Sequence, residues 1–369
     1  MKLKTLLLGS AAAFAVAGGA QAADLSVAEP VDYVRVCDAF GAGYWYIPGT
    51  DTCLKIGGYV RFDVNFHTST AQDWSYPTSV HSAGWDFYTK ASLSVTAKSM
   101  TEYGPLTGYI VLQGLSQNSE ASNNVVSASS TGSLADGDTR YAYVDEAWLE
   151  LGMLLVGRTG SIYDYSGGFT FDGSDYDSDN STDQVRLSWA MSGFGVQLAI
   201  QDPRDRWGTS LSTSYSMPDI VGALTMSQGH WDGKLSFGFA ETTYGSGFGI
   251  QAATTIKLDS IAPGDALRLK AAWAENKVWK FAASKGAGGS ATGSVWSALA
   301  SFQHFWTPTL SSAVTFDYFS QTGLSGYQVY GNLVWSPVTG FFAGVEAGYT
   351  KLSTTSGNWT AKIRLQRSW

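Results

Sequence analysis

Apolar and polar positions alternate along most of the chain. Between Tyr327 and Trp335 every second residue is apolar or small, and the positions between them are largely polar. The same alternation runs from Phe341 to Tyr349. Because successive side chains of a β-strand point to opposite faces, a period of two predicts strands with one apolar face. Both segments carry an aromatic residue at each end of that face, which at about 3.3 Å per residue and a tilt near 40° places the aromatics roughly 20 Å apart.

The same period recurs elsewhere in the sequence and distinguishes the chain from a β-sandwich. It is found again in residues 56–66, 185–191 and 248–258. A sandwich alternates as well, but it requires neither aromatic bands at a fixed height nor strands of this length throughout. Two aromatic girdles around an apolar band are typical of a transmembrane barrel.

The alternation predicts 16 strands separated by connections of two kinds. Long polar connections at 68–83, 118–138 and 161–182 alternate with tight turns such as Ser192-Gly193 and Thr307-Pro308. In outer-membrane barrels the short turns face the periplasm and the long loops face outward. The fold class is therefore all-β, a 16-stranded antiparallel transmembrane barrel. The expected strands are 54–67, 84–98, 106–117, 139–152, 153–160, 183–192, 194–201, 218–228, 231–243, 247–258, 266–276, 293–306, 309–320, 325–336, 340–353 and 358–369.

Composition agrees with a barrel and excludes several other classes of protein. Charged residues make up only 15% of the 369 residues, against about 25% in typical soluble domains. Aromatic residues reach 14%, and there are 42 glycines. The formal net charge is −8, and no basic tract indicates a nucleic-acid partner. Apolar residues therefore alternate with polar ones, as expected for a barrel wall that faces lipid on one side and water on the other.

The N-terminus predicts export. Lys2 and Lys4 precede an apolar stretch at residues 6–17, and Ala20-Gln21-Ala22 has the small-x-small pattern of a signal-peptidase site. The stretch is shorter than the roughly 20 residues that a membrane-spanning helix needs. We expect a cleaved signal peptide at residues 1–22, a periplasmic segment at 23–53 and the barrel at 54–369.

The inward positions predict a wet lumen. A barrel of this strand number is too wide for its own side chains to fill, and charges on the other face would meet lipid at a cost of about 2–4 kcal/mol for Arg or Lys at the midplane. The function expected from this is passive diffusion of small polar solutes and ions through the outer membrane. The inward positions of the first, second and last strands are Lys55, Tyr59, Arg61, Asp63, Asn65, Tyr88, Lys90, Ser92, Ser94, Thr96, Lys98, Thr360, Lys362, Arg364, Gln366 and Ser368.

Cys37 and Cys53 are the two cysteines of the chain. In the oxidising periplasm, two cysteines at this spacing favour a disulfide over a metal site. Closing such a loop would contribute about 3 kcal/mol in the chain-entropy model. We predict a structural disulfide just before the first strand.

Distinctive motifs occur at residues 31–38, 44–50 and 53–61, and the last residue of the sequence is the aromatic Trp369. With these features the chain resembles the general porins of alphaproteobacteria, of the rhizobial type, and the resemblance covers essentially the whole length. It implies a homotrimer whose second external loop, 118–138, contacts a neighbouring subunit. It also implies that the terminal aromatic residue, Trp369, is the signal for the outer-membrane assembly machinery, although Arg367 departs from the usual apolar residue. The motifs that carry the resemblance are Val31-Asp32-Tyr33-Val34-Arg35-Val36-Cys37-Asp38, Tyr44-Trp45-Tyr46-Ile47-Pro48-Gly49-Thr50 and Cys53-Leu54-Lys55-Ile56-Gly57-Gly58-Tyr59-Val60-Arg61.

A further motif, Val156-Gly157-Arg158-Thr159-Gly160, resembles the strand that leads into the third external loop of such porins. The resemblance implies that residues 161–182 fold into the lumen and narrow it. Acids on one side of a narrow aqueous gap and bases on the other would create a transverse field. The expected loop acids are Asp164, Asp172, Asp175, Asp177, Asp179 and, just beyond, Asp183. The expected basic wall is Arg61, Lys90, Arg158, Arg186, Lys362 and Arg364. Arg158 shares its parity with Leu154 and Val156, which would also fit a subunit contact behind that strand.

Other interpretations of the same residues remain open. The acidic loop could be an ordinary external loop. Asp175-Tyr176-Asp177-Ser178-Asp179 begins like an EF-hand, but Asn180 at position six and Arg186 at position twelve exclude one, and only weak calcium binding by external carboxylates stays possible.

The alternatives in function are a substrate-specific channel and a barrel that acts through its external loops. Tyr59, Tyr88 and Tyr109 could line a path for sugars, in which case flux would saturate. A closed pore would mark an adhesin or structural barrel. No metal site, cofactor motif or catalytic constellation is evident around the histidines, so we do not expect an enzyme. The histidines are His67, His81, His230 and His304.

Overall fold

The computed structural model describes residues 35–68, 84–118, 138–172, 176–208, 217–283 and 288–369. The predicted signal peptide, Asp175, His81 and nearly all of the predicted loop 118–138 lie outside these residues. Neither the α-helix nor the 3-10 helices of the described residues are long and apolar enough to cross a membrane.

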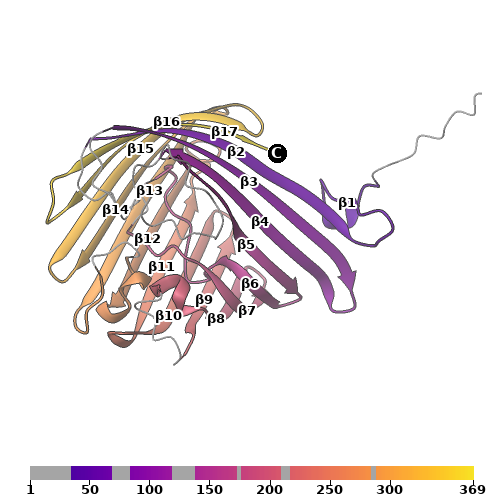
Figure 1. The fold of residues 1–369 in the computed structure, drawn as a ribbon, viewed down its shortest axis with the longest axis horizontal. Helices are drawn as coiled ribbons and strands as arrows, with labels where there is room; N and C mark the ends of the chain where they lie inside the picture. The colour runs from indigo at the N-terminus through magenta and orange to yellow at the C-terminus, as the bar shows by residue number, and fades with distance from the viewer. Residues whose placement is uncertain (1–34, 69–83, 119–137, 173–175, 209–216, 284–287) are drawn as a thin grey trace, which may run out of the picture.

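A closed antiparallel barrel of sixteen strands forms the body of the molecule (Figure 1). Each strand pairs with its neighbours in sequence, and the last pairs with the first, so no edge is left open. The strands are β2 (Cys53–His67), β3 (Gly84–Thr101), β4 (Gly104–Asn118), β5 (Asp138–Leu151), β6 (Leu154–Gly160), β7 (Ser181–Met191), β8 (Phe194–Gln201), β9 (Asp219–Gln228), β10 (Trp231–Thr242), β11 (Gly245–Lys257), β12 (Ala266–Glu275), β13 (Ser294–Thr307), β14 (Leu310–Gln321), β15 (Leu324–Val338), β16 (Phe341–Leu352) and β17 (Asn358–Ser368).

All sixteen predicted strands are confirmed, with ends that differ by up to three residues. The largest difference is at the turn between β3 and β4, where pairing continues to Thr101 and Gly104. Gly104 adopts a φ of +103°, which side-chain-bearing residues rarely reach, and its carbonyl accepts a hydrogen bond from the Thr101 hydroxyl at 2.7 Å. This two-residue turn lets both strands run further than the apolar pattern alone indicated.

The outward face of the barrel is apolar, as the alternation predicts. On β15 and β16, Val329, Trp335 and Val345 are 40–52% exposed. Gln328 and Glu346, which point the other way, are buried at 1% and 4% exposure. The register is therefore set by the apolar face, since a shift of one residue would expose the whole polar set to lipid.

The inner surface differs between two sectors of the wall, which the alternation did not predict. From β8 to β14 several inward residues are small and apolar, and an apolar cluster covers them inside the barrel. Phe281 lies so close to the wall that a Cβ added to Gly249 would be 2.5 Å from its own Cβ. The cluster combines wall residues with residues of the loop after β6, of α2 (Pro203–Trp207) and of the 3-10 helix η2 (Asn276–Phe281): Ala199, Val221, Ala240, Ala274, Val295, Phe319, Tyr163, Tyr176, Trp207, Trp279 and Phe281. The polar inward face predicted for the first, second and last strands therefore does not extend to this sector.

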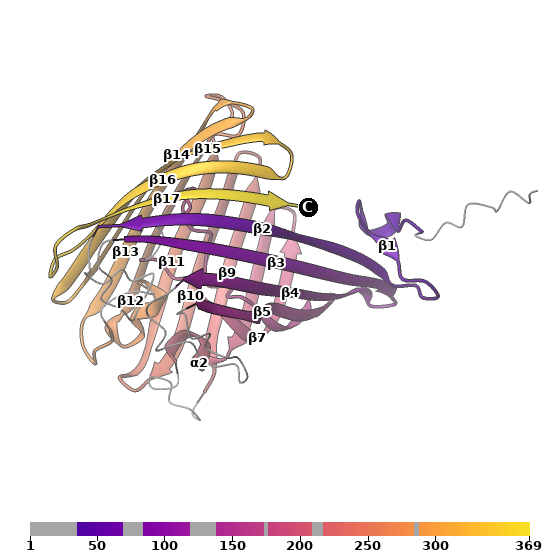
Figure 2. The same ribbon diagram turned by 45° about the horizontal axis from the view of Figure 1, so that its top comes forward.

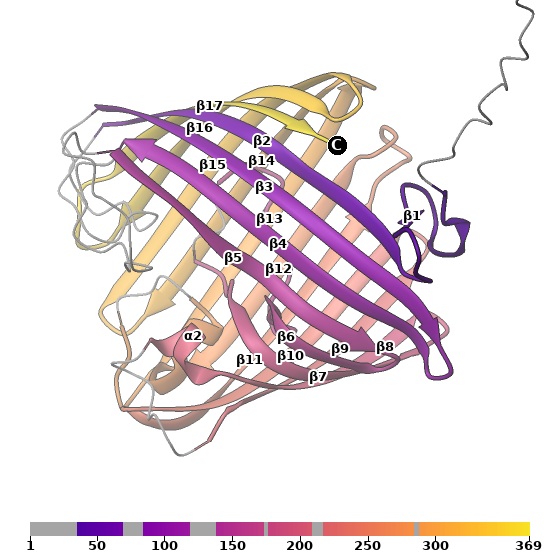
Figure 3. The same ribbon diagram turned by 45° about the vertical axis from the view of Figure 1, so that its right-hand side comes forward.

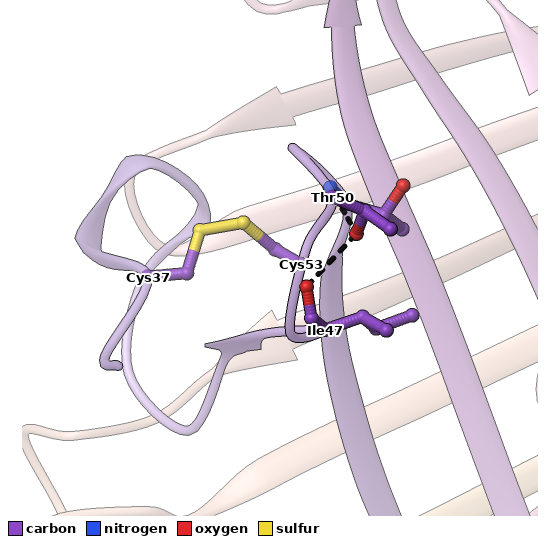
Figure 4. Close-up of a disulfide and its surroundings, with 5 residues drawn as sticks. Cys37, Ile47, Thr50 and Cys53 are labelled. Carbon is purple, nitrogen blue, oxygen red and sulfur yellow. Dashed lines mark hydrogen bonds between the residues drawn. A yellow bond between two sulfur atoms is a disulfide. The ribbon is translucent and has the colours of Figure 1, made fainter. Parts of the chain in front are cut away.

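A small disulfide-linked unit precedes the barrel. It contains a short 3-10 helix, η1 (Asp38–Phe40), and β1 (Trp45–Tyr46), which pairs with the start of β2. The predicted disulfide between Cys37 and Cys53 is confirmed, with a Cα–Cα distance of 6.0 Å, and both cysteines are buried (Figure 4). A turn closed by the Thr50 hydroxyl, which donates to the carbonyl of Ile47 at 3.0 Å, lies beside it. Figure 2 shows this unit beyond the end of the barrel at which β2 begins.

Candidate pore constriction

The connection between β6 and β7 enters the barrel and lies along its inner wall (Figure 1). Inward side chains of successive strands hold its backbone. The contacts run from β10 to β15: Lys234 Nζ donates to the carbonyl of Asp164 at 2.7 Å, Gln251 Nε2 to that of Tyr163 at 2.9 Å and Asn332 Nδ2 to that of Phe169 at 3.3 Å, while Ser301 Oγ accepts from the amide of Phe169 at 2.9 Å and Asp317 Oδ2 from that of Tyr176 at 2.9 Å. The described parts of this connection thus form the inward-folded loop, which we call the constriction loop.

The far part of the constriction loop is anchored on β16 and β17. The carboxylate of Glu346 accepts the backbone N–H groups of Phe171 and Asp172, the latter at 2.8 Å. Asp172 forms an ion pair with Lys362. The Phe171 ring packs under the guanidinium of Arg364, 4.6 Å from its central carbon. The Glu346 carboxylate therefore satisfies two backbone N–H groups of the loop that would otherwise be left without a hydrogen-bond acceptor.

Two of the predicted loop acids face the wall beneath them rather than an aqueous gap. Asp177 forms an ion pair with Lys270 of β12, and both side chains are at most 5% exposed. Burial raises the pKa of Asp177 to about 7, and the ammonium of Lys270 opposes this rise. Asp164 lies 3.7 Å from Arg206 of α2, which is 1% exposed. Asp177 binds the loop to the wall, and the Asp164 carboxylate binds Asn180 of the same loop and faces Arg206 of α2, so the expectation that they confront a basic wall across the lumen is wrong for them.

The remaining acids have different surroundings. Asp172 is 40% exposed and is the predicted acid that combines a place on the loop with a lumen-facing ion pair. Asp179 is exposed on the loop. Asp183 lies on β7, where its backbone pairs with that of Arg158.

Arg158 does not face the lumen. It shares a strand face with Val156, whose cross-strand partner, Val185, is 43% exposed on the outside of the barrel. The guanidinium of Arg158 contacts Asp205 at 2.9 Å and Asp183 at 3.6 Å. The assignment of Arg158 to the basic wall and of Asp183 to the constriction acids is therefore wrong, because strand alternation places both on the outward face.

The other five predicted basic residues lie on inward positions. Arg364 donates two hydrogen bonds to Asp63, at 2.8 and 2.7 Å, and Lys362 pairs with Asp172. Arg186 is half-buried and shares a row across the strands with Leu155 and Glu150. Arg61 and Lys90 lie directly opposite each other on β2 and β3. The structure thus brings Lys362 and Arg364 to the loop, leaves Arg61 and Lys90 on the uncovered wall, and places Arg186 on β7 between the buried Leu155 and Ala199.

The sequence matches a known family over nearly its whole length. Residues 24–367 match the profile of the family described as the porin subfamily. The chain belongs to the porin subfamily. It is a β-barrel protein of the outer membrane, and the predicted family and location are confirmed.

Individual relatives agree with this assignment. This porin is 38% identical over 242 residues to the porin Omp2b of Brucella canis, an alignment that spans 62% of this chain and 63% of the relative's length. The fold is similar to that of the outer-membrane channel DcaP of Acinetobacter baumannii, with a TM-score of 0.68 at 14% identity over 88% of this chain and 99% of the other. It is also similar to the trimer form of OmpT of Vibrio cholerae, with a TM-score of 0.53 at 11% identity over 87% and 100% of the two chains.

The porin has anchoring residues that the sequence analysis did not identify, namely Lys270, Glu346 and Arg206. Lys270 and Glu346 have a signal in the sequence, since each is a charged residue at an inward position of an alternating strand, Lys270 beside Arg268 and Glu346 alone on its strand face. The sequence does not indicate which loop residues they bind, because the partners are far apart in the chain: Glu346 and Phe171 are separated by 175 positions. Arg206 follows β8 in a segment for which no contact was expected.

The described residues have dispersed rather than clustered metal-ligand side chains. They contain no cluster of three His, Cys, Asp or Glu side chains that could hold an ion. His304 contacts Asp265 at 2.7 Å and His230 lies 3.6 Å from Asp259, both at short turns away from the constriction loop. In this part of the chain the chemistry of the lumen is therefore that of fixed charges and hydrogen-bonding groups.

Proposed function

We propose that this porin forms a water-filled channel through which small hydrophilic solutes and ions diffuse passively. The observation that carries the proposal is the difference between the two inner walls. Tyr59, Lys90 and Glu146 on the β2–β5 wall are half-buried, as are Ser94 and Thr96, and no described loop residue bonds to them. Inward polar residues from β11 to β15 are covered: Gln251, Ser301, Thr315, Asp317 and Gln328 are at most 1% exposed. Water therefore has access to polar side chains on β2–β5, which run side by side in Figure 3.

Flux measurements test this proposal. The refolded porin should give stepwise conductance in planar bilayers. Liposomes that contain it should swell in neutral sugars at a rate that falls with solute size, because a fixed aqueous gap sorts solutes by diameter. Bilayers that stay electrically silent after verified insertion would contradict the proposal and favour a structural barrel.

Within the same proposal, lumen charges set the ion preference. Arg61 and Lys90 act from the uncovered wall, Arg186 from β7, and Asp172 with Lys362 from the loop side. Glu146 and Glu150 contribute negative charge from β5. Charges beside a narrow aqueous gap interact at an effective dielectric between those of water and protein, so each should shift the reversal potential, and more strongly at low salt.

A substrate-specific channel is the second candidate, supported by aromatic rings on the open wall. The guanidinium carbon of Arg61 is 5.5 Å from the ring centre of Tyr59 and 5.9 Å from that of Tyr88. Tyr109 and Trp148 have ring centres 5.0 Å apart. A sugar flux that saturates with concentration, while chloride flux does not, would favour this candidate.

We propose a homotrimer, since OmpT of Vibrio cholerae, which has a similar fold, occurs in a trimer form. The outward surface near β6 supports this assembly. Arg158, Asp183 and Asp205 place charge on a face that would otherwise meet lipid, and beside them lies a groove of about 530 Å³ lined by residues that include Gly108, Ile110 and Leu149. Native gels without heating should show a trimer, and a detergent-stable monomer at all concentrations would contradict it.

The ends of the chain have proposed roles as well. We assign residues 1–22 to a cleaved signal peptide and residues 23–53 to a periplasmic segment closed by the disulfide. Trp369 is 57% exposed, and its backbone exchanges hydrogen bonds with Gly58 at 3.1 and 3.3 Å. An exposed side chain on a fixed backbone supports its proposed use as the assembly signal. Mass spectrometry of the exported protein tests the cleavage site.

A further inference from the structure

Arg61 and Lys90 form an unusual pair on the open wall. They are direct cross-strand partners on β2 and β3, and both point into the lumen. Like charges placed directly opposite each other on adjacent strands destabilise a sheet. The pair does not stabilise the barrel, and a bound anion would relieve the repulsion between the two charges.

Nearby carboxylates do not neutralise the pair. The carboxylate nearest to Arg61 is that of Asp63, whose Oδ2 is 4.0 Å from Nε, and both of its oxygens already accept hydrogen bonds from Arg364. Arg61 Nε is buried without a hydrogen-bond partner. Among the residues that the structure describes, no carboxylate lies within 4.0 Å of the Lys90 ammonium, and Asp145 accepts a hydrogen bond from Gln113 instead. Among the described residues, Arg61 and Arg364 thus share the single carboxylate of Asp63, and Lys90 has no carboxylate within 4.0 Å, so positive charge is in excess at this place in the lumen.

Two neighbouring tyrosine rings hold the Arg61 side chain in position. The rings of Tyr59 and Tyr88 lie against the Arg61 guanidinium, which restricts its motion through cation–π attraction. The Arg61 side chain is 19% exposed, so part of it still reaches the lumen. A guanidinium presents a planar fork of donors that matches the two oxygens of a carboxylate or phosphate, and a neighbouring ammonium adds a point charge.

We propose that Arg61 and Lys90 form a binding subsite for a small oxyanion, a carboxylate or a phosphate group, which pauses there during its passage. This inference rests on the proposed channel function. Arg61 would donate two hydrogen bonds to the oxyanion and Lys90 a third. The consequence is that transit of such anions saturates, whereas chloride, a single acceptor atom that cannot form two parallel hydrogen bonds to the fork, binds more weakly and passes without saturation over the same concentrations.

Chloride current in the presence of competing oxyanions tests the subsite. The refolded full-length protein is placed in planar bilayers at constant ionic strength, and acetate or inorganic phosphate replaces part of the chloride. We expect the chloride current to fall along a saturating curve with at least one of the two probes. Arg61→Gln and Lys90→Gln should each raise the half-saturating concentration by about fivefold, the size of one lost charge-assisted contact in a partly wet site. The double variant should show no saturation.

A matched control separates binding from general electrostatics. Lys98→Gln removes the same charge from the same strand, but near the periplasmic end, where Lys98 lies over the rings of Phe40 and Tyr44. It should leave the half-saturating concentration unchanged, and an equal effect of Lys98→Gln would overturn the subsite. Open channels whose current falls without saturation for both probes would also overturn it and leave the channel function intact. A protein that inserts but never conducts would instead contradict the channel function itself.

Discussion

The wall formed by β2–β5 and the wall from β10 to β15 have the same alternating pattern but different interiors. On β3, Tyr88 and Lys90 are half-buried beside an open lumen, whereas Ser301 on β13 and Thr315 on β14 are at most 1% exposed beneath the constriction loop. Alternation determines which side chains face inward. What those side chains meet there depends on loops that fold back from elsewhere in the chain. In the proposed channel one wall borders the diffusion path, and the other is the surface on which the constriction loop packs.

The largest effect on stability and conductance is expected from a substitution that leaves the buried Asp177 carboxylate without its partner. Lys270→Gln removes the partner of Asp177 inside a buried pair, and removal of one partner of such a pair costs about 3–5 kcal/mol. The loop should detach, so single-channel conductance should increase and the melting temperature should fall. Lys257→Gln breaks an exposed ion pair with Asp232 at 3.6 Å and is the control, with an expected cost of about 0–1 kcal/mol. Wild-type conductance for Lys270→Gln would refute this role of the pair.

An effect of similar size on stability, but a smaller one on conductance, is expected from the apolar cluster. Phe281 is fully buried between Tyr163, Trp207 and the wall, and Phe→Ala substitutions of this kind cost about 3–5 kcal/mol. Because the Phe281 ring occupies space inside the barrel, Phe281→Ala should also widen the lumen beside the cluster and raise the conductance modestly. Phe237→Ala, on the lipid-facing side of β10, is the comparison, since Phe237 is 46% exposed. Equal loss of stability in both variants, measured by thermal unfolding in detergent, would argue against a packed cluster inside the barrel.

The open wall should respond in the opposite manner, with changed selectivity and little change in stability. Arg61→Gln removes a charge from a repulsive cross-strand pair, so stability should change by no more than about 0.5 kcal/mol. The reversal potential in a salt gradient should move toward cation preference, most clearly at low salt. A loss of several degrees in melting temperature without a shift in reversal potential would mean that Arg61 is a structural residue.

The smallest effect is expected on the outward face of β6. Arg158→Gln should leave conductance and selectivity unchanged, because the side chain does not reach the lumen. Arg186→Gln, on the inward face of the adjacent β7, should shift selectivity toward cations. A selectivity change for Arg158→Gln equal to that for Arg186→Gln would place Arg158 in the pore and contradict the register described above.

Arg158 shows which parts of the structure the sequence could reveal. Its parity with Leu154 and Val156 already indicated the outward face, and the resemblance to other porins pointed to the pore instead. The prediction from parity was correct, because residues on the lipid-facing side of every strand must alternate with those that face the lumen. The strands and the disulfide followed from similarly local or compartment-level rules. The partners of Glu346 and Lys270 did not, since contacts between a loop and a wall more than 90 positions away exist only once the barrel has closed.

Thiol accessibility at two matched serines tests the difference between the two walls most directly. Ser94 on β3 and Ser301 on β13 are both inward-facing, but Ser94 is half-buried beside the open lumen and Ser301 is 1% exposed. Ser94→Cys and Ser301→Cys are each introduced with the native disulfide intact and treated with a membrane-impermeant thiol reagent. We expect rapid labelling of Ser94→Cys with a drop in conductance, protection of Ser301→Cys in the folded protein, and labelling of both after unfolding. Equal labelling rates in the folded protein would contradict the account of one wet wall and one covered wall.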